Sequence, residues 1–177
     1  DILAMGGRGV AMTNAIWAPD ETYAEKILCG MREASATYNI PIVGGHTNLK
    51  TDRPQLAATI LGRANALITS FNASPGQVLV VASDQRGSYV GGSKNFASFK
   101  GAEAYQLQED NEILPTLAEK KLVTAGKDIS QGGIIGTSIM LAESSKVGIE
   151  IDPLSLNCPD HNLEKWLTAF PSFGFLL

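Results

Sequence analysis

The stretch DETYAEKILCGMREASATYNIPIVGGHT, residues 20–47, carries the clearest helix pattern in the chain and the strand that follows it. Asp20 suits the N-cap position. Apolar side chains then recur at helical spacing as far as Asn39. Residues 40–43 are read as a buried strand that enters a pair of glycines, and residues 46–54 as a polar loop. The stretch therefore predicts a helix that packs on a sheet.

Outside this stretch, strand and helix patterns alternate without a regular rhythm. Apolar runs predict strands at residues 10–17, 56–62, 77–83 and 148–152, and helical spacing predicts helices at residues 102–123, 133–144 and 162–170. We expect a long loop at residues 87–101, a turn at residues 127–130 and a helix break near Pro115. Because the order lacks a strict strand–helix–strand alternation, the α+β class is favoured over a doubly wound parallel sheet.

The bulk composition is that of a globular protein. The chain has 177 residues, 44% of them hydrophobic and 18% charged, with a net charge of −4. The sequence has no basic stripe, which argues against a nucleic-acid partner, and no apolar run of membrane-spanning length. The two cysteines, Cys29 and Cys158, are expected to be reduced thiols, so a cytoplasmic protein is expected.

Both ends of the chain suggest a piece of a longer protein. The sequence begins at Asp1, directly in a motif, and residues 170–177 form an apolar, strand-like run. Such a strand normally joins a sheet. We therefore expect further segments in the complete protein.

Two clusters combine glycines with polar side chains. Asp1 lies close before Gly6-Gly7, where a carboxylate beside a glycine turn could hold a hard cation, although taken alone this aspartate is more simply a helix N-cap. Residues 44–48 read Gly-Gly-His-Thr-Asn after a buried strand, the composition of a phosphate loop or of an ordinary glycine turn. His46 is a candidate for a phosphate contact or simply fills the turn.

Two further clusters carry carboxylates at element ends. Asp128 precedes Ser130 and two glycines at a helix start, so it is a candidate metal ligand or a helix cap. Asp84 and Arg86 follow a predicted strand, where they could orient a polar substrate or form a surface ion pair. No spacing in the chain predicts a nucleophile, base and acid arranged for acyl transfer, so the catalytic residues stay open.

Three motifs together resemble the ATP-binding superfamily of AIR synthase, also called PurM-like. They are Asp-Ile-Leu-Ala-Met-Gly-Gly at residues 1–7, Ile-Val-Gly-Gly-His-Thr at residues 42–47 and Asp-Ile-Ser-Gln-Gly-Gly at residues 128–133. The superfamily includes selenophosphate synthetase, thiamine-monophosphate kinase and a hydrogenase maturation factor. The Gly-Gly-His-Thr element is most similar to selenophosphate synthetase. Residues 127–152 and 166–177 resemble AIR-synthase-related proteins of the methanogenesis-marker-2 type.

The resemblance implies two α+β domains, each present in part: an N-terminal ATP-binding domain at residues 1–90 and a C-terminal domain at residues 91–177. It also implies a homodimer and Mg-ATP bound in a cleft. By matching motifs, Asp1 and Asp128 are expected to bind magnesium, and the triphosphate is expected at Gly44, Gly45, His46, Thr47 and Asn48. His46 stands where thiamine-monophosphate kinase has a metal-binding aspartate.

The expected function is therefore magnesium-dependent transfer of a phosphoryl group from ATP to a small-molecule acceptor near Asp84 and Arg86. Such chemistry needs positioning and charge neutralisation more than covalent help from the protein. One alternative is a non-catalytic nucleotide-binding or dimerisation protein of the same fold. Another is a metabolic α+β enzyme that does not use ATP.

Overall fold

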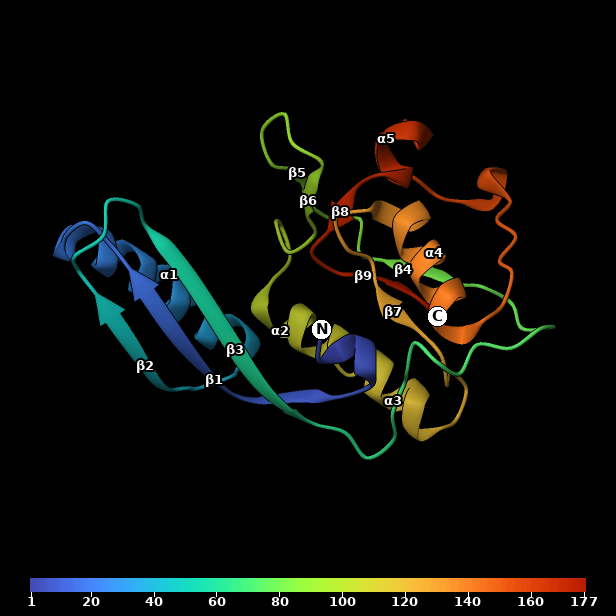
Figure 1. The fold of residues 1–177 in the computed structure, drawn as a ribbon, viewed down its shortest axis with the longest axis horizontal. Coiled ribbons are helices and arrows are strands. Elements are labelled where there is room, and N and C mark those ends of the chain that lie inside the picture. The colour runs from blue at the N-terminus through green and yellow to red at the C-terminus, as the bar shows by residue number, and fades with distance from the viewer.

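The computed structural model describes residues 1–177 and shows two units side by side (Figure 1). The first unit is a sheet with one long helix. Its elements are β1 (Arg8–Trp17), α1 (Glu21–Tyr38), β2 (Ile42–Asn48) and β3 (Gln55–Arg63). The strand order is β2-β1-β3, with β1 parallel to β2 and antiparallel to β3. Helix α1 covers one face of this sheet (Figure 1).

The ends of α1 follow from single residues, as the sequence predicts. The Asp20 carboxylate accepts a hydrogen bond of 2.9 Å from the Tyr23 backbone N–H, which is the usual N-cap contact. Asn39 ends the helix in the left-handed conformation, with φ of 52°. Between these ends Ala24 packs on Ile16 of β1, which is fully buried. The clearest helix of the sequence is confirmed.

Strand β2 corrects one expectation. The polar loop predicted from residue 46 is wrong, because His46, Thr47 and Asn48 continue the strand and pair with Ala15, Ile16 and Trp17 of β1. Two glycines weaken a strand in isolation because they have no side chains to pack. The backbone hydrogen bonds to β1 stabilise the strand instead. At Gly45 an added Cβ would lie 2.4 Å from the Asn14 Oδ1, so a larger residue there would displace the Asn14 side chain.

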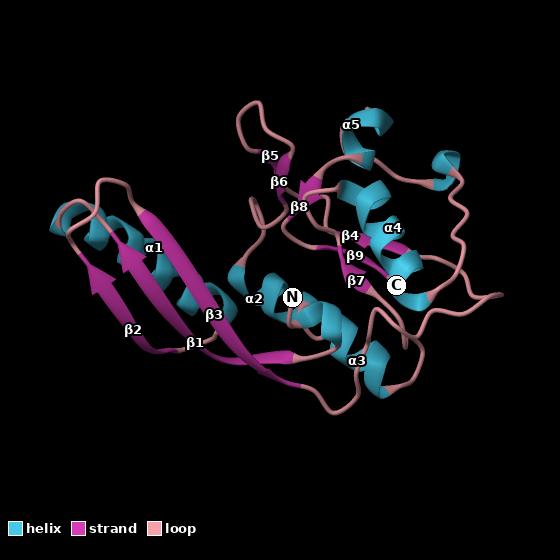
Figure 2. Ribbon diagram, in the orientation of Figure 1, coloured by secondary structure: helices cyan, strands magenta, loops and turns pink.

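The second unit contains two small sheets and the remaining helices (Figure 2). One sheet has the order β4-β9-β7 and the other β5-β6-β8. The strands are β4 (Val81–Ser83), β5 (Ser88–Tyr89), β6 (Asn95–Ala97), β7 (Lys127–Asp128), β8 (Phe170–Pro171) and β9 (Gly174–Leu176). The helices are α2 (Ala104–Asp110), α3 (Ile113–Glu119), α4 (Gly133–Ser145), η2 (Pro153–Ser155) and α5 (Leu163–Leu167). The mixture of both element types confirms the α+β class.

The largest core of the second unit forms around Trp166, which is 1% exposed. Phe96 of β6 meets the Trp166 ring edge-on, with the ring centroids 5.3 Å apart. Helix α4 contributes Ile134 and Leu141, and strand β9 contributes Leu176. Residues from across the whole second half of the sequence thus share one core.

Short strands account for most of the corrections in the second unit. The predicted loop at 87–101 contains β5 and β6, the predicted turn at 127–130 begins with β7, and residues 148–152 form no strand. Strands of two or three residues depend on partners distant in sequence, such as β8 for β6, and a local pattern does not reveal them.

The helix break lies at Asn111 and Glu112, four residues before the predicted position near Pro115. Pro115 is the third residue of α3. The N–H groups of the first helical turn have no partner within the helix, so a proline there removes no bond. The proline therefore starts a helix instead of breaking one.

The two units are joined at the start of the chain. The turn η1 (Leu3–Met5) lies against α3 and β7. Arg8 of β1 donates to Glu112 at 2.7 Å and to Glu119 at 2.6 Å, and the Gln108 amide donates to the Thr37 carbonyl at 2.8 Å. These contacts tie β1 and α1 to α2 and α3. The division of the sequence at residues 90 and 91 stays a prediction.

Among the helices, none combines the length and the apolar character that crossing a membrane requires.

Gly133 provides a sharp test of the fold. Its φ is +66°, and an added Cβ would lie 2.4 Å from the Leu167 carbonyl oxygen, whereas Gly136 in the same helix has open space around it. We expect Gly133→Ala to lower the free energy of unfolding by about 1–3 kcal/mol, as for a strained left-handed residue.

The matched variant Gly136→Ala should raise the free energy of unfolding by about 0.5–1 kcal/mol, because alanine favours a helix interior. Urea denaturation followed by circular dichroism measures both changes. Equal effects of the two substitutions would contradict the described start of α4.

Candidate functional site

A cleft with two adjoining cavities lies where the two units meet. The first cavity, of about 270 Å³, is bounded by β4, β9, α2 and α3. The second, of about 490 Å³, lies between η1, β1, β3 and the α2–α3 junction. Leu3, Asn111 and Phe173 line both cavities. The two cavities thus adjoin at these three residues, the first lined by η1 and the second unit and the second lined by both units.

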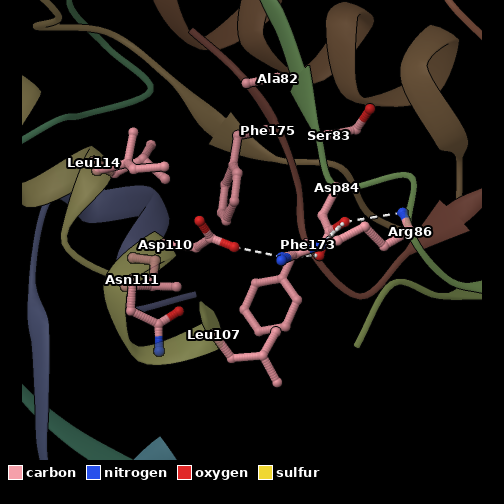
Figure 3. A pocket seen from close by; sticks show the side chains of 12 residues that line it. Ala82, Ser83, Asp84, Arg86, Leu107, Asp110, Asn111, Leu114, Phe173 and Phe175 are labelled. Carbon is pink, nitrogen blue, oxygen red and sulfur yellow. Dashed lines mark hydrogen bonds and ion pairs between the residues drawn. The ribbon is translucent and has the colours of Figure 1, made fainter. Parts of the chain in front are cut away.

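An ion-pair network forms the polar side of the first cavity (Figure 3). The Arg86 guanidinium donates two hydrogen bonds to the Asp84 carboxylate, of 2.9 and 2.8 Å. The same guanidinium also donates to Asp110 at the end of α2. The Arg86 backbone N–H adds a third bond to Asp84, of 3.0 Å. Asp84 and Arg86 thus form a rigid fork that faces the cavity.

The fork controls the ionisation of Asp84. Burial of this carboxyl acts to raise its pKa, but the side-chain and backbone hydrogen bonds from Arg86 outweigh burial, so the pKa of Asp84 lies below its ordinary value. The pKa of Arg86 is raised by its hydrogen bonds to Asp84 and Asp110. Burial, followed by the nearby Asp84 charge, raises the pKa of Tyr38. Asp84 therefore stays ionised at neutral pH.

Asp1 and Arg8 line the second cavity together with Glu112. Asp1 is exposed, whereas Arg8 is held by Glu112 and Glu119 at 2.7 and 2.6 Å. The pKa of Arg8 is raised by its hydrogen bonds to Glu119 and Glu112. Arg8 and Arg86 are thus each paired with two carboxylates, so the net charge of the cleft is negative.

Asp128 lies close to this cleft without lining either cavity. It is directly opposite Phe175 in the β7–β9 pair, and directly opposite residues place their side chains on the same face of a sheet. Phe175 lines the first cavity, and β7 lies against η1. The Asp128 carboxylate is half-buried, 3.9 Å from the Lys127 ammonium. The structure therefore brings the segments of Asp1 and Asp128 into one region.

Residues 44–48 are not brought to that region within one chain. They lie on β2, at the edge of the first sheet, and β2 runs away from the cleft (Figure 1). His46 follows Ile42 by four residues, about 13 Å along a strand. All of residues 43–47 are exposed. The predicted triphosphate residues and the predicted magnesium ligands are therefore separate in the single chain.

The cleft contains no group of three or more histidine, cysteine or carboxylate side chains arranged to hold a metal ion, and neither does the rest of the chain. Magnesium commonly takes only one or two carboxylates from the protein and the remaining oxygens from phosphates and water.

The sequence did not single out several residues that shape the cleft. Phe173 lies between the two cavities and contacts Tyr38, with ring centroids 6.0 Å apart. Asp110 completes the network of Arg86, and Arg8 joins β1 to α3. Aromatic residues near the end of a sequence and carboxylates at helix ends are common in all proteins. Only their proximity in the folded structure identifies Phe173 and Asp110 as residues of the cleft.

Comparison with known proteins finds two consecutive domains of one family. Residues 1–64 match the family described as AIR synthase related protein, N-terminal domain, and residues 74–177 match AIR synthase related protein, C-terminal domain. An uncharacterized protein of Synechocystis sp. is 46% identical over 179 residues, which cover all of this chain and 56% of that protein. The chain thus spans about half the length of this relative.

Solved structures share the fold. The Thermotoga maritima protein PurL complexed with ATP matches all of this chain and 30% of its own, with a TM-score of 0.72 and 21% identity. Thiamine monophosphate kinase from Aquifex aeolicus, complexed with AMPPCP and TMP, matches 99% of this chain and 63% of its own, with a TM-score of 0.70 and 18% identity. Both domains of the chain therefore adopt the arrangement seen in these structures.

The fork at Asp84 makes a testable prediction about ionisation. With Arg86→Gln, Asp84 loses the guanidinium and keeps only the backbone N–H bond of residue 86, so its pKa should rise from its lowered value. Carbon-13 NMR titration of the aspartate carboxyls measures this pKa. Arg53→Gln, in the exposed loop before β3, is the control and should leave Asp84 unchanged.

The sign of the stability change follows. In the native chain the folded pKa is lowered, so the contribution of the fork is complete above the unfolded pKa and is lost as pH falls through the folded value. In Arg86→Gln this contribution should shrink at neutral pH, because only the backbone hydrogen bond to Asp84 remains. An Asp84 pKa that is the same in this variant and in the native chain would show that the Arg86 side chain does not control it.

Proposed function

The chain belongs to the family of AIR synthase related proteins, and we propose that it forms part of a magnesium-dependent enzyme that transfers a phosphoryl group from ATP to a small molecule. The observation that carries this proposal is the cleft between the two units. There Asp1 lines one of two adjoining cavities, and Asp84 and Arg86, which are far from Asp1 in the sequence, line the other. Two proteins that share the fold are complexed with ATP or with AMPPCP.

The charge of the cleft favours a nucleotide that carries magnesium. Arg8 and Arg86 are each neutralised by two carboxylates, so neither offers a free positive charge to a triphosphate. A bare triphosphate would meet net negative charge, whereas a divalent cation reverses the local field. We assign Asp1 and Asp128 as the residues that hold the magnesium, and we place the acceptor beside Asp84 and Arg86.

The triphosphate is assigned to Gly44, Gly45, His46, Thr47 and Asn48. Their backbone and hydroxyl groups are exposed on an edge strand, which leaves N–H groups free for phosphate oxygens. Because this strand lies away from the cleft of its own chain, the assignment requires a second copy.

A homodimer through the first sheet supplies that second copy. Helix α1 covers one face of the sheet, and the other face is open. Thr13, Ala15 and Thr59 lie on the open face by their register, and so does Leu61, which is 67% exposed. Leu61 lies near the end of the edge strand β3, and in this dimer the partner copy covers its exposed apolar side chain.

A second candidate is a non-catalytic nucleotide-binding protein of the same fold. It is favoured by the separation of residues 44–48 from the cavities within the single chain. The two candidates differ in turnover. The enzyme releases ADP when an acceptor is present, whereas the non-catalytic protein binds Mg-ATP and leaves it intact.

Calorimetric titration with ATP, with and without magnesium, tests the site. We expect binding that depends on magnesium and that Asp128→Asn weakens by about 1–3 kcal/mol, the usual value for a charge-assisted contact. The control Asp52→Asn removes an exposed loop carboxylate of the first unit and should have no effect. Unchanged affinity in Asp128→Asn would remove Asp128 from the site, and an absence of ATP binding would contradict the proposal.

Light scattering at micromolar concentration tests the dimer. Leu61→Glu places a charge on the open sheet face, so the dissociation constant of the dimer should rise at least about tenfold, since burying an unpaired charge is strongly unfavourable. Leu154→Glu is the matched control, because Leu154 is 90% exposed in η2, outside the first sheet. A native chain that is monomeric at these concentrations would exclude this interface.

A further inference from the structure

The first cavity has apolar walls from three directions. Leu107 and Leu114, from α2 and α3, are 3% and 5% exposed, and Phe175 of β9 is 8% exposed. Phe173 closes the side toward the second cavity. In Figure 3 the two phenylalanine rings lie on opposite sides of the ion pair between Asp110 and Arg86. Such walls suit a flat apolar or aromatic group.

The volume of the first cavity limits what enters it. At about 270 Å³ it lies just below the range for small-molecule pockets, which is about 300–1,000 Å³. This space fits one ring with a short substituent and is too small for a whole nucleotide. The second cavity, at about 490 Å³, is the larger part of the cleft.

The polar end of the first cavity carries an uncompensated negative charge. Two carboxylates, Asp84 and Asp110, face a single guanidinium, that of Arg86. Asp84 uses both oxygens on Arg86, whereas only the Oδ2 of Asp110 does so, which leaves the Asp110 Oδ1 free. Asp110 is also the more accessible carboxylate, with its side chain 45% exposed against 15% for Asp84. Asp110 is therefore the carboxylate of the cavity that keeps a free oxygen.

We infer that the first cavity binds an aromatic or heteroaromatic ring that carries a positively charged or N–H-donating nitrogen group. The ring packs against Leu107, Leu114 and Phe175, and the nitrogen group donates to the free oxygen of Asp110. An anionic substituent on the same ring is rejected by the excess carboxylate. Asp110 is therefore the residue that sets the specificity for charge.

This inference rests on the proposed function only in treating the bound ring as part of the phosphate acceptor. The shared wall of Leu3, Asn111 and Phe173 would then direct the rest of that molecule toward the second cavity. Binding of the ring itself needs neither ATP nor magnesium. A test without nucleotide therefore separates the two proposals.

Benzamidine is a direct probe, because it combines one ring with a cationic group of N–H donors. We expect it to bind with a dissociation constant on the order of 1 mM, usual for a single-ring fragment. Methyl NMR should show shifts at Ala82, Leu107 and Leu114. Benzoate, with the same ring and the opposite charge, should bind at least about tenfold more weakly.

Asp110→Asn keeps the shape of the side chain and removes its charge. It should weaken benzamidine about tenfold and abolish the preference over benzoate. Asp160→Asn is the matched control, since Asp160 is a similarly exposed carboxylate that pairs with Lys165 at 3.3 Å outside this cavity. This control should leave both probes unchanged. Ala82→Leu, which fills the cavity from β4, should abolish binding of either ring.

The inference is overturned if benzoate binds as tightly as benzamidine, if Asp110→Asn leaves their ratio unchanged, or if neither probe shifts the cavity methyls. Benzamidine binding in a chain that fails to bind Mg-ATP would support this inference and contradict the proposed function. The reverse pattern would support the proposed function and contradict this inference.

Discussion

The packing of Ala4 and Ile68 against Leu114, Ala118 and Phe175 holds the two units of the chain together. All five side chains are buried, and they come from the first turn, the connection after β3, helix α3 and strand β9. Burial of apolar surface of this kind contributes roughly 25 cal/mol per Å². The cleft exists because this cluster fixes α3 and β9 on either side of η1.

Electrostatics then determine what the cleft accepts. Arg8 and Arg86 each form ion pairs with two carboxylates. Arg8 pairs with carboxylates at the two ends of α3. Arg86 pairs with one carboxylate after β4 and one at the end of α2. Their charges are therefore unavailable to an incoming anion. Positive charge must arrive with the ligand, as magnesium beside a triphosphate or as a nitrogen group on an acceptor. One physical property, the excess of carboxylates, thus accounts for both proposals.

Long regular elements could be predicted from the sequence, and short ones could not. Helix α1, with its caps at Asp20 and Asn39, and the strand at Arg8–Trp17 follow from local spacing and capping chemistry. The hairpin of β5 and β6 and the strand continuation at His46 depend on pairing partners elsewhere in the chain. Family resemblance and α+β class were likewise accessible, because three motifs in order carry them.

The candidate site was accessible in part. Asp1, Asp84 and Arg86 were singled out by sequence and do line the cleft, whereas Asp110 and Phe173 needed the structure.

The central claim is that Mg-ATP occupies this cleft, and hydrogen–deuterium exchange with and without Mg-ATP tests it most directly. The account predicts slower exchange at η1, α3 and β7 only when both magnesium and ATP are present. Unchanged exchange there, or protection confined to residues 148–157, would contradict it.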